Sequence, residues 1–129
     1  MQKIFIFLIF LTATLPVFSQ NSKVSELMNQ GNYQKAQELL TMKQAPSEMD
    51  INDLSALGIC YIKLKDYNKG ETIFREITSR KRARPRHYLY YGEILRINKK
   101  YAEAKEAFKI FLKEDPSRDE VHLKIQSCD

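Results

Sequence analysis

The sequence is poor in the residues that most enzymes and metal sites use. Its 129 residues include two histidines, two cysteines and four glycines. Neither His87 nor His122 pairs with a serine or cysteine in a pattern that suggests a triad, and no histidine–cysteine cluster has zinc spacing. The glycines form no phosphate-binding loop. We therefore expect a protein that has no catalytic activity and uses no metal or cofactor.

The two cysteines, Cys60 and Cys128, are too few and too far apart to form a disulfide framework. Cys60 lies among apolar residues at helical spacing, where a thiol often serves as a small hydrophobic side chain. An exported protein does meet an oxidising compartment. We nevertheless expect no bridge between these two residues.

Residues 1–19 have the three regions of a secretory signal peptide. Lys3 precedes an apolar block at 4–11, and Val17 and Ser19 occupy the positions expected before a cleavage site. We predict that the chain is exported to the periplasm, with association with an outer-membrane complex as an open alternative, and that residues 20–129 form one mature domain. The alternative is an uncleaved anchor. It is disfavoured because the block is shorter than the ~20 residues that span a bilayer and Pro16 interrupts the apolar region.

The mature sequence repeats itself at a constant spacing, the one that separates Gly58 from Gly92, without any insertion. The pairs that coincide include Leu54 with Tyr88, Gly58 with Gly92, Tyr67 with Tyr101, Phe74 with Phe108 and Leu40 with Phe74. Within each unit, apolar residues recur at helical spacing on both sides of a short polar turn, which predicts two antiparallel helices. The predicted helices are 22–30 and 33–44, 51–64 and 67–79, and 86–98 and 101–113, followed by a capping helix after Pro116.

This pattern resembles the tetratricopeptide repeat family. The residues that carry the resemblance are Leu57, Gly58, Tyr61, Tyr67, Gly70 and Phe74 in the second unit, and Tyr91, Gly92, Leu95, Tyr101, Ala104, Phe108 and Pro116 in the third. The resemblance implies an all-α fold, a right-handed α-solenoid of antiparallel helix pairs. It places repeats at about 22–46, 51–84 and 85–116 and a capping helix at about 117–127. The first repeat is degenerate, with a short first helix and Val24 in place of the glycine.

Glycine in a helix interior costs about 1 kcal/mol relative to alanine, so Gly58 and Gly92 require an explanation. We interpret them as the points where the two helices of a repeat cross. Burial of the aromatic residues around each crossing outweighs the loss, at about 2–3 kcal/mol per ring. On this interpretation Gly92→Leu should loosen the third repeat, whereas Gly92→Ala should be mild.

The family resemblance also implies a binding groove on the inner face of the solenoid, lined by the first helix of each pair. The positions that correspond are Asn52, Ser55, Ile59, Ile62 and Lys63 in the second unit, and Arg86, Leu89, Glu93, Arg96 and Ile97 in the third. Aliphatic and charged residues in this mixture suit a peptide or protein segment. Ala56 and Tyr90 stand where some family members have a residue that grips a C-terminal carboxylate, so that type of adaptor is disfavoured.

Positive charge is concentrated in one loop of a sequence whose net charge is +5. The basic residues of this loop are Arg80, Lys81, Arg82, Arg84 and Arg86. We favour a solvated linker that leads into a helix at Pro85. The alternative is an electrostatic site for anionic lipid or an acidic protein surface. The export signal argues against nucleic acid as the partner.

The sequence as a whole predicts a non-catalytic scaffold or adaptor in the cell envelope, which binds a protein or peptide. A second hypothesis is the N-terminal module of a truncated or split envelope protein that combines tetratricopeptide repeats with a domain like that of outer-membrane protein A. Such a module would serve envelope assembly or secretion. A third is a binder of anionic membrane surfaces through the loop at 80–86. We also expect that a solenoid of so few repeats can self-associate.

Overall fold

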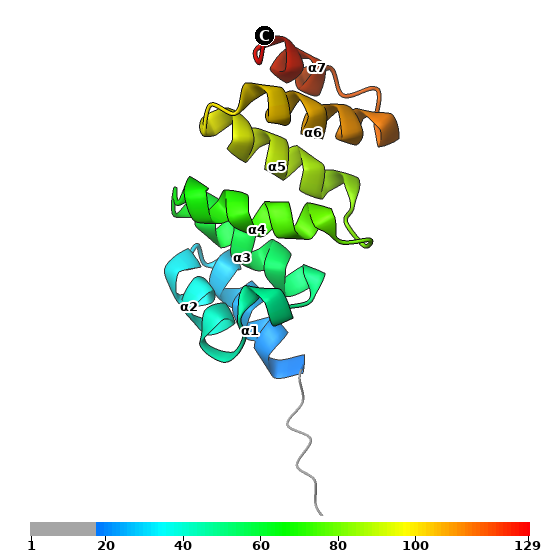
Figure 1. Cartoon of the computed structure of the whole chain (residues 1–129). Helices are drawn as coiled ribbons and strands as arrows, with labels where there is room; N and C mark the ends of the chain where they lie inside the picture. The colour runs from blue at the N-terminus through cyan, green and yellow to red at the C-terminus, as the bar shows by residue number, and fades with distance from the viewer. Residues whose placement is uncertain (1–17) are drawn as a thin grey trace, which may run out of the picture.

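The computed structural model describes residues 18–129 as a stack of helices (Figure 1). The elements are α1 (Phe18–Asn29), α2 (Tyr33–Lys43), the short 3-10 helix η1 (Pro46–Glu48), α3 (Ile51–Lys63), α4 (Tyr67–Ser79), α5 (Pro85–Ile97), α6 (Tyr101–Glu114) and α7 (Asp119–Gln126). The predicted signal peptide lies outside the described residues except for Phe18 and Ser19, the first residues of α1. Within residues 18–129 there is no strand.

Each helix packs against the next one along the chain, and α1 also contacts α3. The helices α1, α3 and α5 are the first members of their pairs and are called A helices below; α2, α4 and α6 are the B helices. The helix α7 lies at the far end of the stack, against α6. This arrangement is the predicted all-α solenoid of antiparallel helix pairs, and the bounds of α2 to α6 differ from the predicted ones by one residue at most.

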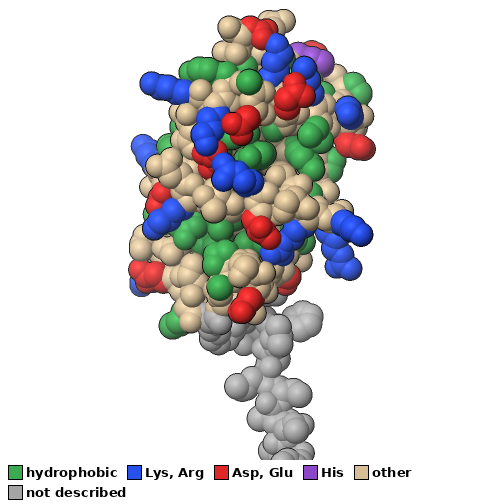
Figure 2. Space-filling view, viewed as in Figure 1, with side chains coloured by type: hydrophobic (Ala, Val, Ile, Leu, Met, Phe, Trp, Pro, Cys, Tyr) green, Lys and Arg blue, Asp and Glu red, His purple; other side chains and the backbone are tan. Residues whose placement is uncertain are grey.

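The turns between the A and B helices repeat the same backbone geometry. Gly31, Lys65 and Lys99, spaced by the repeat length, have φ values of +76°, +61° and +62°. In each turn the following N–H bonds back to the A helix, as from Lys100 N to Leu95 O at 2.8 Å, which closes a Schellman motif. Figure 2 shows lysine and arginine side chains protruding along the edge where these turns lie.

Two glycines of the A helices lie against aromatic rings of the B helices. A Cβ at Gly58 would be 2.5 Å from Cε2 of Phe74, and a Cβ at Gly92 would be 2.6 Å from Cε1 of Phe108. Both rings are fully buried, so in a close-packed core they can withdraw only by displacing their neighbours. The crossing-point interpretation therefore holds in a stricter form, and our expectation that alanine would be mild at Gly92 is wrong, because even a methyl group overlaps the ring.

Gly70 of α4 differs from these two glycines. A Cβ there would be 3.4 Å from Cδ1 of Ile94 and 3.6 Å from Cβ of Tyr61, which are ordinary contact distances. The equivalent positions of the other repeats are Ala36 and Ala104, both fully buried. The B-helix position therefore accepts a methyl group, whereas the A-helix position in the second and third repeats does not.

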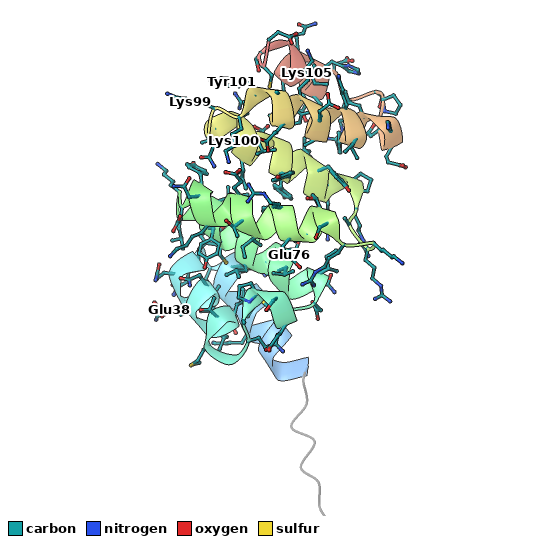
Figure 3. The ribbon with its side chains drawn as sticks, viewed as in Figure 1. Glu38, Glu76, Lys99, Lys100, Tyr101 and Lys105 are labelled. Carbon is teal, nitrogen blue, oxygen red and sulfur yellow. The ribbon has the colours of Figure 1, made fainter. Side chains whose placement is uncertain are left out.

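A buried carboxylate joins the second repeat to the third. Glu71 of α4 is 5 % exposed and accepts hydrogen bonds from Lys100 Nζ at 2.6 Å and from Asn98 Nδ2 at 2.8 Å. Arg75 also pairs with it at 2.8 Å. Figure 3 shows Lys100 at the turn between α5 and α6. Burial acts to raise the pKa of Glu71, but the hydrogen bonds from Lys100 and Asn98 and the charges of Lys100 and Arg75 outweigh it, so the pKa is lowered.

Candidate functional site

A cavity of about 280 Å³ lies between successive A helices. Its lining residues are Met28 of α1, Asn52, Ser55, Ala56 and Ile59 of α3, and Arg86 and Tyr90 of α5. Four of the ten predicted groove residues, Asn52, Ser55, Ile59 and Arg86, are thus brought together. Three A helices contribute to one concave surface, as expected for a groove that runs across the repeats.

The other six predicted groove residues do not line this cavity. Ile62 and Leu89 are half-buried, and Lys63 and Ile97 are exposed. Glu93 and Arg96 pair with each other at 3.1 Å, and Glu93 also forms an ion pair with Lys124 of α7. These two charged groups therefore have partners within the solenoid, and the last helix is held to α5 through one of them.

Three lining residues were not predicted. Tyr90 is 37 % exposed, and its ring centroid lies 5.5 Å from that of Phe74, so one side packs on the core while the other faces the cavity. Ala56 adds a small apolar side chain from α3, and Met28 extends the apolar surface onto α1. Met28 lies one repeat length before Ile62, so the repeat itself would have found this residue.

A hydrogen bond between two repeats lies beneath the cavity. Ser55 Oγ of α3 is 2.9 Å from Nε2 of His87, which is 2 % exposed. The other ring nitrogen, Nδ1, accepts the backbone N–H of Arg84 at 2.9 Å, a capping bond at the start of α5. Because Nδ1 is an acceptor, Nε2 must carry the proton of the neutral ring and donate it to Ser55. Burial lowers the pKa of His87, and the charges of Arg86 and Arg84 lower it further.

This arrangement is opposite to that of a catalytic serine–histidine pair. A general base must accept the serine proton at one nitrogen while the other nitrogen donates to a carboxylate. His87 instead donates to Ser55 and accepts from a backbone amide. The pair therefore acts as a structural connection between α3 and α5, which fixes the A helices on both sides of the cavity.

The basic loop between α4 and α5 divides into two parts. Arg80 is half-buried; its guanidinium donates to Met49 O and to the Glu76 carboxylate, so it closes the loop against the second repeat. Lys81, Arg82, Arg84 and Arg86 are exposed. Figure 2 shows basic side chains protruding where this loop leaves the stack. The five predicted residues are therefore one structural arginine and four that face solvent.

The remaining chemistry of the described part of the chain is limited. Residues 18–129 contain no group of three histidine, cysteine or acidic side chains that could hold a metal ion. Cys60 and Cys128 are free thiols, and burial raises the pKa of Cys60 to about 11. Among the helices of residues 18–129, none combines the length and the apolarity needed to cross a membrane.

A sequence model of the tetratricopeptide repeat matches residues 54–84, which cover the second helix pair. This chain contains a tetratricopeptide repeat. No curated protein matches the sequence. The tetratricopeptide solenoid predicted from the sequence is confirmed by the all-helical structure and by solved structures that share its fold.

Three of these structures show the likeness. One is the Yersinia enterocolitica type III secretion chaperone SycD in complex with a peptide of the translocator YopD, with 14% identity, a TM-score of 0.74 and coverage of 86% of this chain and 90% of that one. Another is the first tetratricopeptide domain of Spaghetti (RPAP3) bound to the HSP90 peptide SRMEEVD, with 19% identity, a TM-score of 0.73 and coverage of 86% and 88%. A MamA RS-1 double mutant has 16% identity, a TM-score of 0.77 and coverage of 86% and 62%. At these identities the likeness concerns the fold.

Proposed function

We propose that this chain is a non-catalytic interaction scaffold that holds a segment of another protein in the groove between α1, α3 and α5. The observation that carries the proposal is the cavity, in which apolar side chains from three A helices meet one arginine. The side chain of Arg86 forms no hydrogen bond or ion pair with any residue in the described range 18–129, so its charge is free for a ligand. Two structures with the same fold contain a bound peptide, which supports this type of partner.

The cellular place of the scaffold in our proposal is the periplasm, where it would join a complex of the cell envelope. The support is the signal-peptide pattern of residues 1–19. Mass spectrometry of the protein released by osmotic shock should find Gln20 as the first residue. Recovery of the unprocessed chain from the cytoplasm alone would contradict the location while leaving the groove proposal intact.

The binding proposal is tested by a photo-crosslinking amino acid placed at single positions. At Ile59, in the cavity, it should form adducts with a partner in cells that express the chain. At Glu38, exposed on the B helix α2, the same amino acid should form none, and this position serves as the matched control (Figure 3). Adducts of equal yield from both positions, or from neither, would refute the groove as the binding surface.

A further inference from the structure

We infer that the groove selects an extended segment that carries an aliphatic or aromatic side chain and, two residues away, a carboxylate side chain. The inference rests on the proposed function and specifies the chemistry of the ligand. Three features of the cavity lead to it: the apolar wall, the unpaired arginine and the distance between them.

The apolar wall comes from Met28, Ala56, Ile59 and Tyr90. Tyr90 is fixed by its contact with the buried ring of Phe74, so it offers a rigid surface that loses little freedom when a ligand binds. The walls belong to three different helices, two of which are held together by the Ser55–His87 hydrogen bond. The cavity is therefore preformed for one apolar side chain.

The charge requirement comes from Arg86. Its side chain is exposed at the cavity and has no acidic partner within residues 18–129. The exposed residues Lys81, Arg82 and Arg84 precede it, and the buried ring of His87 is neutral, so the potential at this end is positive. The carboxylate of Asp50 caps α3 by accepting the N–H groups of Asn52 and Asp53 at 2.8 and 2.9 Å, and it forms no ion pair with Arg86.

The spacing follows from α5. Arg86 and Tyr90 are four residues apart, so their Cβ atoms lie about 5–6 Å apart on one face of the helix. An extended ligand presents side chains on the same face at every second residue, about 6.6 Å apart. The ligand side chain that packs on Tyr90 and the ligand carboxylate that pairs with Arg86 therefore belong to ligand residues i and i+2. Adjacent residues point to opposite faces and cannot fill both places.

Fluorescence anisotropy of short labelled peptides with both termini blocked tests the inference on the full chain. The probe contains Leu-Ser-Glu within a Gly-Ser sequence; matched probes contain Leu-Ser-Lys, Leu-Glu-Ser or Ser-Ser-Glu at the same place. We expect the first probe to bind about tenfold more tightly than each of the others. Arg86→Glu should weaken the Leu-Ser-Glu probe about tenfold and strengthen the Leu-Ser-Lys probe. Equal affinity for the glutamate and lysine probes would overturn the inference.

The control variant is Arg84→Glu, which makes the same charge change two residues away, outside the cavity lining. If Arg84→Glu and Arg86→Glu weaken the probe equally, a general positive field is responsible and the inference fails. If phosphatidylserine vesicles bind the chain, this binding is lost with Arg84→Glu, and none of the peptide probes binds, the basic loop binds membranes and the inference also fails. Crosslinking from Ile59 is the separate readout of the proposed function: adducts there, with no glutamate preference, would overturn the ligand chemistry alone.

Discussion

Val24 and Leu40 of the first repeat lie buried in one apolar cluster, each one repeat length before Gly58 and Phe74 of the second repeat. The first pair has a larger side chain on the A helix and a smaller one on the B helix. The second pair has the reverse, with a Cβ at Gly58 reaching to 2.5 Å from the Phe74 ring. The degenerate first repeat therefore has its larger side chain on α1 and its smaller one on α2, the reverse of the second repeat.

This comparison predicts that the second repeat can accept the side chains of the first, with valine at Gly58 and leucine at Phe74. Gly58→Val alone overlaps the Phe74 ring, and Phe74→Leu alone leaves space in the core, so each should lower the free energy of unfolding by about 1–3 kcal/mol. The double variant should lose less than the sum, with a coupling energy of about 1–2 kcal/mol in urea unfolding. Strict additivity of the two losses would show that the residues do not share the crossing.

The contrast between two glycines gives a second prediction. Gly92→Ala should lower the free energy of unfolding by about 1–3 kcal/mol, because its methyl group overlaps the Phe108 ring. Gly70→Ala should leave it unchanged or raise it by up to about 1 kcal/mol, because the site has room and alanine favours the helix. The measurement is chemical denaturation of both variants. A loss of the same size at both positions would contradict the packing.

Lys99 is strained in the same way as Lys65, since both have a left-handed backbone that glycine adopts freely at Gly31. Lys99→Gly should therefore raise the free energy of unfolding by about 0.5–1 kcal/mol. The same change at Lys109, an exposed residue in the interior of α6, should lower it by about 1 kcal/mol. A destabilised Lys99→Gly variant would mean that the lysine side chain makes a contact that outweighs the strain.

The buried histidine makes stability depend on pH. The unfolded chain has the ordinary histidine pKa of 6.5, and the folded pKa is lower, so between these two values the unfolded state binds more protons. The contribution of His87 to the free energy of unfolding is then fully present above about pH 6.5 and is lost as the pH falls toward the folded pKa. A protonated ring would also turn an N–H toward the amide of Arg84 and break the cap.

Unfolding free energies measured from pH 8 down to pH 5 test this dependence. The wild-type chain should lose stability below about pH 6.5, and His87→Gln should remove that part of the loss. His122→Gln is the control, because it removes the other histidine, which is exposed on α7; the loss assigned to His87 should persist in this variant. A wild-type profile that is flat over this range would show that His87 is protonated at no cost in the fold.

The repeat period explains how far the sequence could predict the structure. Features that repeat, such as the helix bounds and the Gly58 and Gly92 crossings, follow from comparing the chain with itself. Features that break the period do not. Ser55 and His87 are 32 residues apart, so their bond joins positions that never coincide under the shift.

The loop contacts could not be predicted for a related reason. Arg80 was assigned to an exposed basic cluster because the sequence shows only its charged neighbours. One of its partners is the Glu76 carboxylate, and the other is the backbone carbonyl of Met49, just after η1; every residue type carries such a carbonyl. Side-chain identity therefore gives no indication that Arg80 faces inward. Arg86, in contrast, lines the cavity, because its place in α5 is also a groove position of the repeat.

The contact of Glu71 with the next repeat leads to the last prediction. Glu71→Gln keeps the shape of the side chain but removes the charge that attracts Lys100 and Arg75, both of which can turn to water. Because these partners are about half exposed, the expected loss is modest, about 1–2 kcal/mol in urea unfolding. The folded pKa of Glu71 is below its usual 4.5, so its contribution is present above that pH and is lost as the pH falls through the folded value. The variant should therefore lose less stability than the wild-type chain between pH 5 and pH 3, and parallel profiles would show that the carboxylate does not join the repeats.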